Sequence, residues 1–337
     1  MIRWLAILTA VLALVGCATP YVQPAMIPPA GFAGPRIEDP AVPATPGAIL
    51  VDDGARLPFL RWGPDRPWAV IVALHGMNDY SAAFRLAGPA WAERGIATYA
   101  YDQRGFGAAP GRGLWAGEAR MTQDLKTVVA LVRARHPGAV VAVVGESMGG
   151  AVAISAFASA DPPAADRLVL LAPGVWGWSS QSPLNRVSLW FAARLFGDRA
   201  VEPPEWAVRD IRATDNLTQL IRNGNDPAFI LGTRFDTLSG LVDLMESASV
   251  KLGQVWGPTL LMYGARDDII EKGPMRLALR RAGDPPNLRT AWYPDGYHLL
   301  NRDLQADVVY RDVEAWLRDP EGHLPSGAPQ VLPKLTE

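Results

Sequence analysis

The sequence predicts an α/β fold, a doubly wound and mostly parallel sheet with a helical cap inserted between two of its core strands. Short apolar runs alternate with amphipathic helical stretches, as expected for parallel strands that are buried on both faces. One long interval, residues 174–256, interrupts this alternation and is helical in character. An insertion of this kind lies above the carboxyl ends of the strands, which is where α/β folds bind their ligands.

Composition narrows the possible functions. The chain has 337 residues, 49% of them hydrophobic and 20% charged, which is long enough for one large α/β domain with an insertion. Its formal net charge of −2 and the lack of a dense Lys/Arg run argue against nucleic acid as a partner. The histidines are isolated and no phosphate-binding glycine loop occurs, so no metal or other cofactor is predicted. Nothing in the sequence indicates an oligomeric state.

The N-terminus has the pattern of a secretory signal in residues 1–16. A positive start that includes Arg3 precedes an apolar run from Trp4 to Gly16. This run is too short to span a bilayer, which takes about 20 residues. It closes on Leu-Val-Gly-Cys, which resembles the bacterial lipoprotein signal, and that resemblance implies attachment to a membrane through lipidated Cys17. An uncleaved anchor and an ordinary secretory signal are the alternatives.

Cys17 is the only cysteine, so a disulfide within the chain is excluded. By the same resemblance the location is the bacterial cell envelope. The outer membrane is favoured, because Ala18 stands where lipoproteins retained in the inner membrane carry aspartate.

Residues 17–47 are rich in proline and lack apolar periodicity, which predicts an extended tether, part of which could also pack along the domain. The α/β core is then expected in residues 48–173 and 257–319, the cap in 174–256 and an irregular tail in 320–337. A leading hairpin is predicted from Ala48–Asp52 and Leu57–Trp62. The buried strands that follow are expected at Ala69–Leu74, Ala97–Tyr101, Val140–Val144, Leu168–Ala172, Thr259–Tyr263 and Leu288–Tyr293.

Amphipathic spacing predicts the helices. Apolar residues recur every three or four positions over Ala119–Arg135 and again over Leu304–Leu317, the closing helix of the core. Within the cap, no strand is expected. The helical stretches predicted there are Leu189–Phe196, Val208–Thr214, Thr218–Asn223 and Leu238–Ser249.

A candidate nucleophile, Ser147, lies between a buried strand and a helix in the sequence Gly-Glu-Ser-Met-Gly. A serine on such a strand-to-helix turn presents its hydroxyl to a substrate, provided that a base takes the proton and an acid orients the base. The candidate base is His298, in the loop between the last strand and the last helix. Of the other histidines, His136 and His323 are interpreted as solvent-facing, and His75 as shaping a loop.

The acid is expected after an intermediate strand, because this fold uses the chain order serine, acid, histidine. Asp267 follows Thr259–Tyr263 and is the candidate, with the neighbouring Asp268 as the alternative and a plain charged turn as a third interpretation. Two backbone N–H groups must bind the oxyanion. We assign them to Met148, directly after the serine, and to Met77, in the loop after Ala69–Leu74. The methionine side chains line the adjacent apolar wall or pack in the core.

These motifs resemble the monoacylglycerol lipase and lysophospholipase branch of the α/β-hydrolases, a group related to serine aminopeptidases, over residues 48–319. The resemblance places the nucleophile on Ser147, the acid on Asp267, the base on His298 and the oxyanion donors on Met77 and Met148. The sequences that carry it are His75-Gly76-Met77, Asp102 to Gly107, Gly145 to Gly150, Asn225-Asp226-Pro227, Gly264 to Asp267 and Tyr297-His298.

The chain departs from the family pattern at two points. Asn78-Asp79-Tyr80-Ser81 stands where the family usually has Gly-Glu-His-Ser. Gln103 to Gly107 reads Gln-Arg-Gly-Phe-Gly in place of His-Arg-Gly-His-Gly. Both segments are expected near the site, so they bear on the substrate more than on the hydrolytic chemistry.

The cap is rich in aromatic residues, and Trp176, Trp178 and Trp190 are candidates for binding an acyl chain. The alternative is that they form the cap's own core. An apolar cap beside a membrane anchor favours an acyl-lipid substrate, a monoacylglycerol or lysophospholipid whose ester is cleaved through an acyl-serine intermediate. A small-ester esterase, an aminopeptidase or a transacylase would use the same residues. A non-catalytic lipid-binding envelope lipoprotein is a further alternative.

Overall fold

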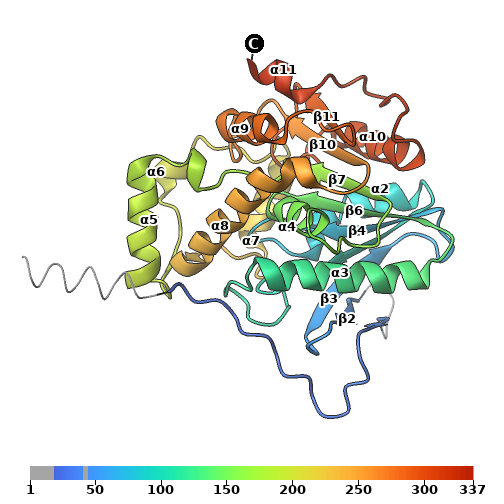
Figure 1. Cartoon of the computed structure of the whole chain (residues 1–337), viewed down its shortest axis with the longest axis horizontal. Helices are drawn as coiled ribbons and strands as arrows, with labels where there is room; N and C mark the ends of the chain where they lie inside the picture. Colours follow the sequence, from blue (N-terminus) through green and yellow to red (C-terminus); the bar gives the residue numbers. More distant parts are fainter. Residues whose placement is uncertain (1–18, 41–44, 337) are drawn as a thin grey trace, which may run out of the picture.

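The computed structural model describes residues 19–40 and 45–336, so the signal segment and Cys17 lie outside the described residues. In this part of the chain a nine-stranded sheet forms the centre of the molecule (Figure 1), in the order β1-β2-β3-β5-β4-β6-β7-β10-β11. The first three strands run antiparallel to their neighbours and the remaining six are parallel. The strands are β1 Arg36–Glu38, β2 Gly47–Leu50, β3 Arg56–Trp62, β4 Ala69–Leu74, β5 Ile96–Tyr101, β6 Val140–Glu146, β7 Arg167–Leu171, β10 Thr259–Gly264 and β11 Leu288–Tyr293.

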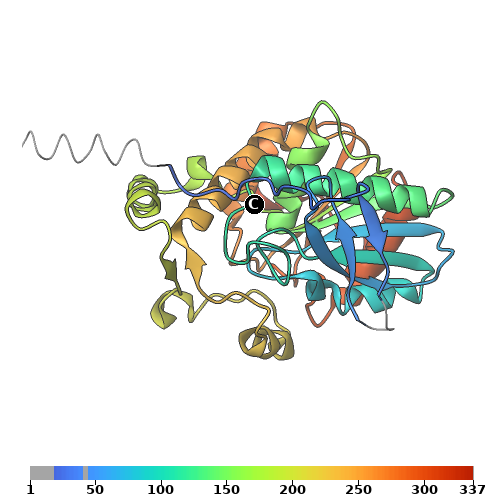
Figure 2. The same ribbon diagram turned by 90° about the horizontal axis from the view of Figure 1, so that it is seen from below.

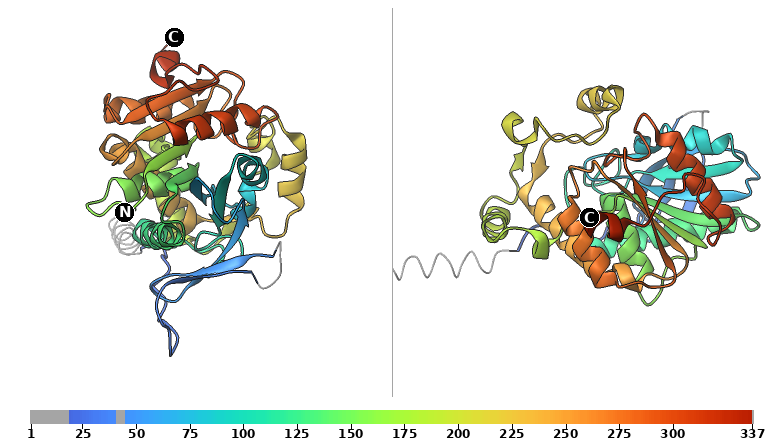
Figure 3. Two further views of the ribbon diagram at one scale, coloured as in Figure 1. Left: turned by 90° about the vertical axis from the view of Figure 1, so that its right-hand side faces the viewer. Right: turned by 90° about the horizontal axis from the view of Figure 1, so that it is seen from above.

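Two helical layers bury the two faces of this sheet. In β4, Val70, Val72 and Leu74 belong to one hydrophobic core, and the alternate residues 69, 71 and 73 belong to the other. This alternation explains why the strand is apolar at every position. The views in Figure 3 show the twisted sheet between the two layers. One layer includes α3 Glu118–Arg135, α4 Met148–Phe157 and α9 Lys272–Ala282, and the other includes η1 Ser81–Phe84, α2 Ala87–Ala92 and α10 Ala306–Arg318.

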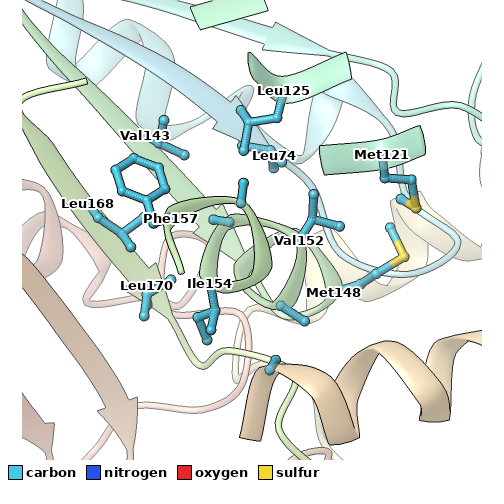
Figure 4. Packing of buried hydrophobic residues seen from close by; sticks show 14 of the residues in the cluster. Leu74, Met121, Leu125, Val143, Met148, Val152, Ile154, Phe157, Leu168 and Leu170 are labelled. Atoms are coloured by element: carbon cyan, nitrogen blue, oxygen red, sulfur yellow. The ribbon is translucent and has the colours of Figure 1, made fainter. Parts of the chain in front are cut away.

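Helix α4 passes through the first of these cores. Its residues Val152, Ile154 and Phe157 pack among side chains from the sheet and from α3 (Figure 4). The predicted strands coincide with the observed ones within two residues, and the ends of β4 and β11 agree fully. The serine at position 147 is therefore held between two rigid elements, β6 and α4.

The N-terminal segment, residues 19–40, packs along the domain, which is the alternative to an extended tether that the sequence leaves open. It lies along the domain surface beneath α3 (Figure 1, Figure 2), and its last part forms β1, which pairs with β2. Gln23 donates from its backbone N–H to Trp115 O (2.8 Å) and from Nε2 to Leu114 O (2.6 Å), and the Met26 N–H donates to Asp53 Oδ2 (2.9 Å). The partners in these hydrogen bonds are far away in the chain, so the sequence of the segment itself does not indicate them.

The cap lies between β7 and β10, and its helices α5 and α7 stand away from the sheet in Figure 2. Ser182 begins α5 by accepting a hydrogen bond from the Asn185 N–H (3.2 Å), with Pro183 at the first helical position. Two predictions are wrong. A short antiparallel ribbon occurs in the cap, and residues 209–214 are not helical. The cap elements are η2 Trp178–Ser180, α5 Pro183–Leu195, β8 Ala200–Val201, α6 Glu205–Val208, α7 Leu217–Asn225, β9 Thr233–Arg234, α8 Phe235–Lys251 and η3 Leu252–Gln254.

The tail is also more ordered than predicted. Residues Val331–Thr336 form α11, which buries Val331 and Leu335 against the core. The Trp292 N–H donates to Pro329 O (2.8 Å) and holds the tail beside β11. Over the described ranges 19–40 and 45–336, we find no helix with the length and apolar character that a membrane crossing requires.

Candidate active site

Ser147 occupies a strained turn between β6 and α4. Its φ of 53° and ψ of −117° lie where residues with a side chain are uncommon. The flanking glycines permit this turn, because a Cβ on Gly145 would lie 2.6 Å from Gly149 O and a Cβ on Gly149 would lie 2.4 Å from Leu74 O. The Ser147 N–H donates to Leu171 O (3.0 Å), which fixes the turn against β7. The serine is half-buried and faces a cavity.

The acid and the base come from the loops after β10 and β11. Nδ1 of His298 lies 2.9 Å from Oδ2 of Asp267, and both residues are buried. The second carboxylate oxygen of Asp267 accepts hydrogen bonds from the N–H groups of Ile269 (2.9 Å) and Ile270 (2.8 Å). Asp268 is exposed and accepts only from a cap N–H, so the partner of His298 is Asp267.

The electrostatic surroundings of His298 favour its charged form. Burial lowers the pKa of this imidazole, but the charge and hydrogen bond of Asp267, together with the charge of Glu146, raise it by more, so the pKa lies above its ordinary value of 6.5. With Nδ1–H directed to Asp267, Nε2 is the nitrogen that can accept a proton from the serine.

Ser147, His298 and Met77 line one cavity of about 350 Å³. Three other groups of residues line this cavity. Helix α7 and the cap segment after it contribute apolar residues and Asn223, and the loop after β10 contributes Ile269. The third group is a set of buried charged side chains. The remaining lining residues are Gly76, Asp79, Glu146, Ala213, Leu220, Gly224, Phe229, Leu299 and Arg302.

The two assigned oxyanion donors flank the serine. Met148 begins α4, so its N–H has no partner within the helix. The loop that carries Met77 approaches the turn so closely that a Cβ on Gly76 would lie 3.2 Å from the Ser147 Cβ. The Met77 side chain lines the cavity, whereas the Met148 side chain is buried in the core beside Met121 (Figure 4).

His75 holds the oxyanion loop in place. Its Nδ1 lies 2.8 Å from Gly76 O, and its Nε2 accepts from the Gln103 N–H (3.0 Å). Burial lowers its pKa, which keeps the ring neutral for these two bonds. This agrees with the loop-shaping interpretation. For His136 the interpretation is wrong, because that ring is buried and bonded to the Tyr99 hydroxyl (2.9 Å), whereas His323 is exposed.

None of the three candidate tryptophans lines the cavity that contains Ser147. Trp176 packs against the core, and Trp178 lines a groove between α5 and α8 and donates to Asp243 (2.6 Å). Trp190 packs on Phe191 and under the Arg194 guanidinium. These side chains find partners inside the cap or against the core, which corrects their assignment to the substrate site. The cap residues that reach the site, such as Leu220 and Phe229, had no distinguishing sequence signal.

A strained serine, a buried Asp–His pair and two backbone N–H groups at the carboxyl ends of parallel strands define the class. The protein is a serine hydrolase with the α/β-hydrolase fold.

Comparison with known proteins identifies the family. Residues 65–305 match the family described as serine aminopeptidase, S33, so the chain belongs to that family. It is 26% identical over 275 residues to a monoacylglycerol lipase of Mycolicibacterium smegmatis, covering 78% of this chain and 93% of that protein. It is 23% identical over 294 residues to the human monoglyceride lipase, covering 84% and 94%. A soluble variant of the Saccharomyces cerevisiae monoglyceride lipase, solved with a substrate analogue, has the same fold, with a TM-score of 0.66, 16% identity and coverage of 90% and 98%.

Proposed function

We propose that this protein is a membrane-anchored serine hydrolase that cleaves the carboxylic ester of a monoacyl lipid. The observation that carries the proposal is the cavity at Ser147, which is lined both by the apolar residues Leu220, Phe229 and Ile269 and by a buried charged cluster. The ester of a monoacyl lipid joins an apolar acyl chain to a polar head group, and this cavity offers a matching lining to each. Similarity over 93% and 94% of the length of two proteins named as monoacylglycerol or monoglyceride lipases supports the same substrate class.

The proposed reaction begins with attack of the Ser147 Oγ on the ester carbonyl carbon while His298 Nε2 takes the hydroxyl proton. Asp267 stabilises the imidazolium that forms. The carbonyl oxygen becomes an oxyanion bound by the N–H groups of Met77 and Met148, each contributing about 3 kcal/mol of transition-state stabilisation. His298 then protonates the departing alcohol, leaving an acyl-serine. Water repeats the sequence and releases the fatty acid.

The charged cluster in the cavity favours a neutral head group. Asp79 and Glu146 supply two carboxyl groups there, and Arg302 supplies a single cation. A phosphodiester would compete with these two carboxyl groups for the single cation, whereas glycerol hydroxyls can donate to carboxyl oxygens. Monoacylglycerol is therefore favoured over lysophospholipid. The volume of about 350 Å³ is near the low end of small-molecule sites, which run from about 300 to 1,000 Å³.

The test is turnover of p-nitrophenyl esters of increasing chain length, in parallel with monoacylglycerol and lysophosphatidylcholine. We expect monoacylglycerol to have the highest kcat/KM, and Ser147→Ala to abolish both turnover and labelling by a fluorophosphonate probe. Activity confined to acetate esters would support the small-ester alternative. Activity confined to peptides would support an aminopeptidase.

The anchoring part of the proposal rests on the lipoprotein-type signal and Cys17. Two acyl chains give stable membrane attachment where one gives only marginal binding. In a bacterial host, the wild-type chain should incorporate labelled palmitate and sediment with outer membranes, and Cys17→Ala should do neither. Equal labelling of both chains would contradict the assignment.

A further inference from the structure

Arg302 is buried between two carboxylates in the charged cluster of the cavity. Its Nη1 donates to Asp79 Oδ2 (2.5 Å), and its Nη2 donates to Glu146 Oε1. All three side chains are at least 96% buried, and all three line the cavity that contains Ser147. Burying three charged groups is costly, so their position calls for a reason beyond packing.

Each partner of Arg302 belongs to a different part of the catalytic machinery. Asp79 lies two residues after Met77, in the loop that carries one oxyanion donor. Glu146 directly precedes Ser147, and Met148 with the other donor follows the serine. Arg302 itself is four residues after His298. One planar side chain therefore connects the oxyanion loop, the nucleophile turn and the histidine loop.

The oxyanion loop is also bonded to the cap from its other side. Asn78 O accepts from the Ile230 N–H (2.9 Å), Asn78 Nδ2 donates to Thr233 Oγ1 (2.8 Å), and the Tyr80 hydroxyl donates to Asp226 (2.6 Å). Asn78 has a positive φ of 66°, a left-handed conformation that asparagine adopts more readily than most residues. On its other side, the same loop is paired with Arg302 through Asp79.

We propose that Arg302 is a positioning residue that fixes the oxyanion loop against the nucleophile turn, and so sets the spacing of the Met77 and Met148 N–H groups. The inference rests on the acyl-serine chemistry proposed above and holds for any ester that the site accepts. A displacement near 1 Å at a reacting centre can cost about 100-fold in rate. A mispositioned donor lowers kcat more than it raises KM, because the oxyanion exists only in the transition state.

The charges of this cluster also affect His298. Asp267, Glu146, Arg302 and Asp303 are the charged groups around the imidazole; Glu146 raises its pKa and Arg302 lowers it. Glu146→Gln removes a charge that raises this pKa, so the acid limb of the kcat/KM profile should move to lower pH. A role of the cluster in stability alone predicts no such shift.

The experiment compares Arg302→Met with Arg104→Met on a short soluble p-nitrophenyl ester. Arg104 is a matched control, because it is equally buried and bonded to two carboxylates, Asp53 and Asp124, yet does not line the cavity. For Arg302→Met we expect kcat to fall by about 10- to 100-fold with KM within about threefold. Arg104→Met should lose stability but keep the kcat of its folded fraction. Arg302→Lys, which retains the cation, should recover part of the rate.

If Arg302→Met does not fold, the proposal is tested with a variant in which all three charged side chains of the cluster are replaced by neutral ones. The triple variant Asp79→Asn, Glu146→Gln, Arg302→Met leaves no unpaired buried charge and should recover thermal stability. We expect its kcat to remain low, because the guanidinium fork is absent. Recovery of both stability and kcat would overturn the inference, as would a folded Arg302→Met with wild-type kcat. Wild-type protein that resists a fluorophosphonate probe would instead refute the proposed function.

Discussion

Replacing Asp267 by asparagine tests the catalytic arrangement most directly. The carboxylate has three hydrogen-bond partners, namely the His298 ring and the N–H groups of Ile269 and Ile270. An asparagine oxygen can still accept from the two N–H groups, so the loop should keep its shape. Its NH₂ group would then face His298 Nδ1, which must become an acceptor. The ring proton would move to Nε2, the nitrogen that has to take the proton of Ser147.

The expected size of the effect follows from this change of tautomer. In serine hydrolases, an acid replaced by its amide costs about 10⁴ in kcat, which corresponds to about 5 kcal/mol of transition-state stabilisation. Burial enlarges the electrostatic part, because Asp267 stabilises the imidazolium in a site that excludes water. KM should change little, because Asp267 does not line the cavity.

Asp268→Asn is the matched control, one residue along the same loop. This exposed side chain makes one hydrogen bond, with the Arg212 N–H, and none with His298. We expect its kcat to stay within about threefold of wild type. The assay is initial-rate hydrolysis of a soluble ester by the two purified variants, with thermal unfolding to show that both are folded. An Asp267→Asn variant that keeps a tenth of the activity, or an equal loss in Asp268→Asn, would refute the reasoning.

Three further outcomes are expected. The kcat/KM of the wild type should rise with pH through a pKa above 6.5, because only neutral His298 can accept the serine proton; an acid limb below 6.5 in a titration from pH 5 to 9 would contradict the raised pKa. Gly149→Ala should lower the free energy of unfolding by about 3 kcal/mol in urea, because its Cβ would lie 2.4 Å from the last backbone oxygen of β4, whereas Gly138→Ala, with nothing within 4 Å, should stay within about 0.5 kcal/mol. Gln23→Ala should lower the free energy of unfolding by about 1 kcal/mol, because it loses the bond to the loop after β5, and the exposed Gln254→Ala should lower it less. Equal urea midpoints for the two variants would mean that the N-terminal segment is not docked.

The sheet could be predicted from sequence because burial on both faces leaves a local mark. All six residues of β4 are buried, so the strand is one uninterrupted apolar run. The turn at Ser147 leaves a local mark as well, because backbone atoms approach Gly145 and Gly149 too closely for a side chain. Where a structural constraint acts on residues that are close together in the chain, the local sequence pattern indicates it.

Contacts between distant segments leave no such mark. Gln23 bonds to a carbonyl 91 residues away, so the docked N-terminal segment has the same composition as a free tether. Arg302 pairs with Asp79 and Glu146 at separations of 223 and 156 residues, and no periodicity connects them. The choice between Asp267 and Asp268 depends only on which side chain turns inward. For the cap tryptophans, composition indicates burial but not the partner.

The departure of Asn78-Asp79-Tyr80 from the usual family sequence has a structural explanation. Asn78 and Tyr80 bond to the cap, and Asp79 bonds to Arg302. The three residues therefore match partners elsewhere in this chain. Replacing them with the usual Gly-Glu-His would remove the side-chain bonds of Asn78 and Tyr80 to the cap. Because Met77 immediately precedes them, the position of the cap and the geometry of the oxyanion site are fixed by the same short loop.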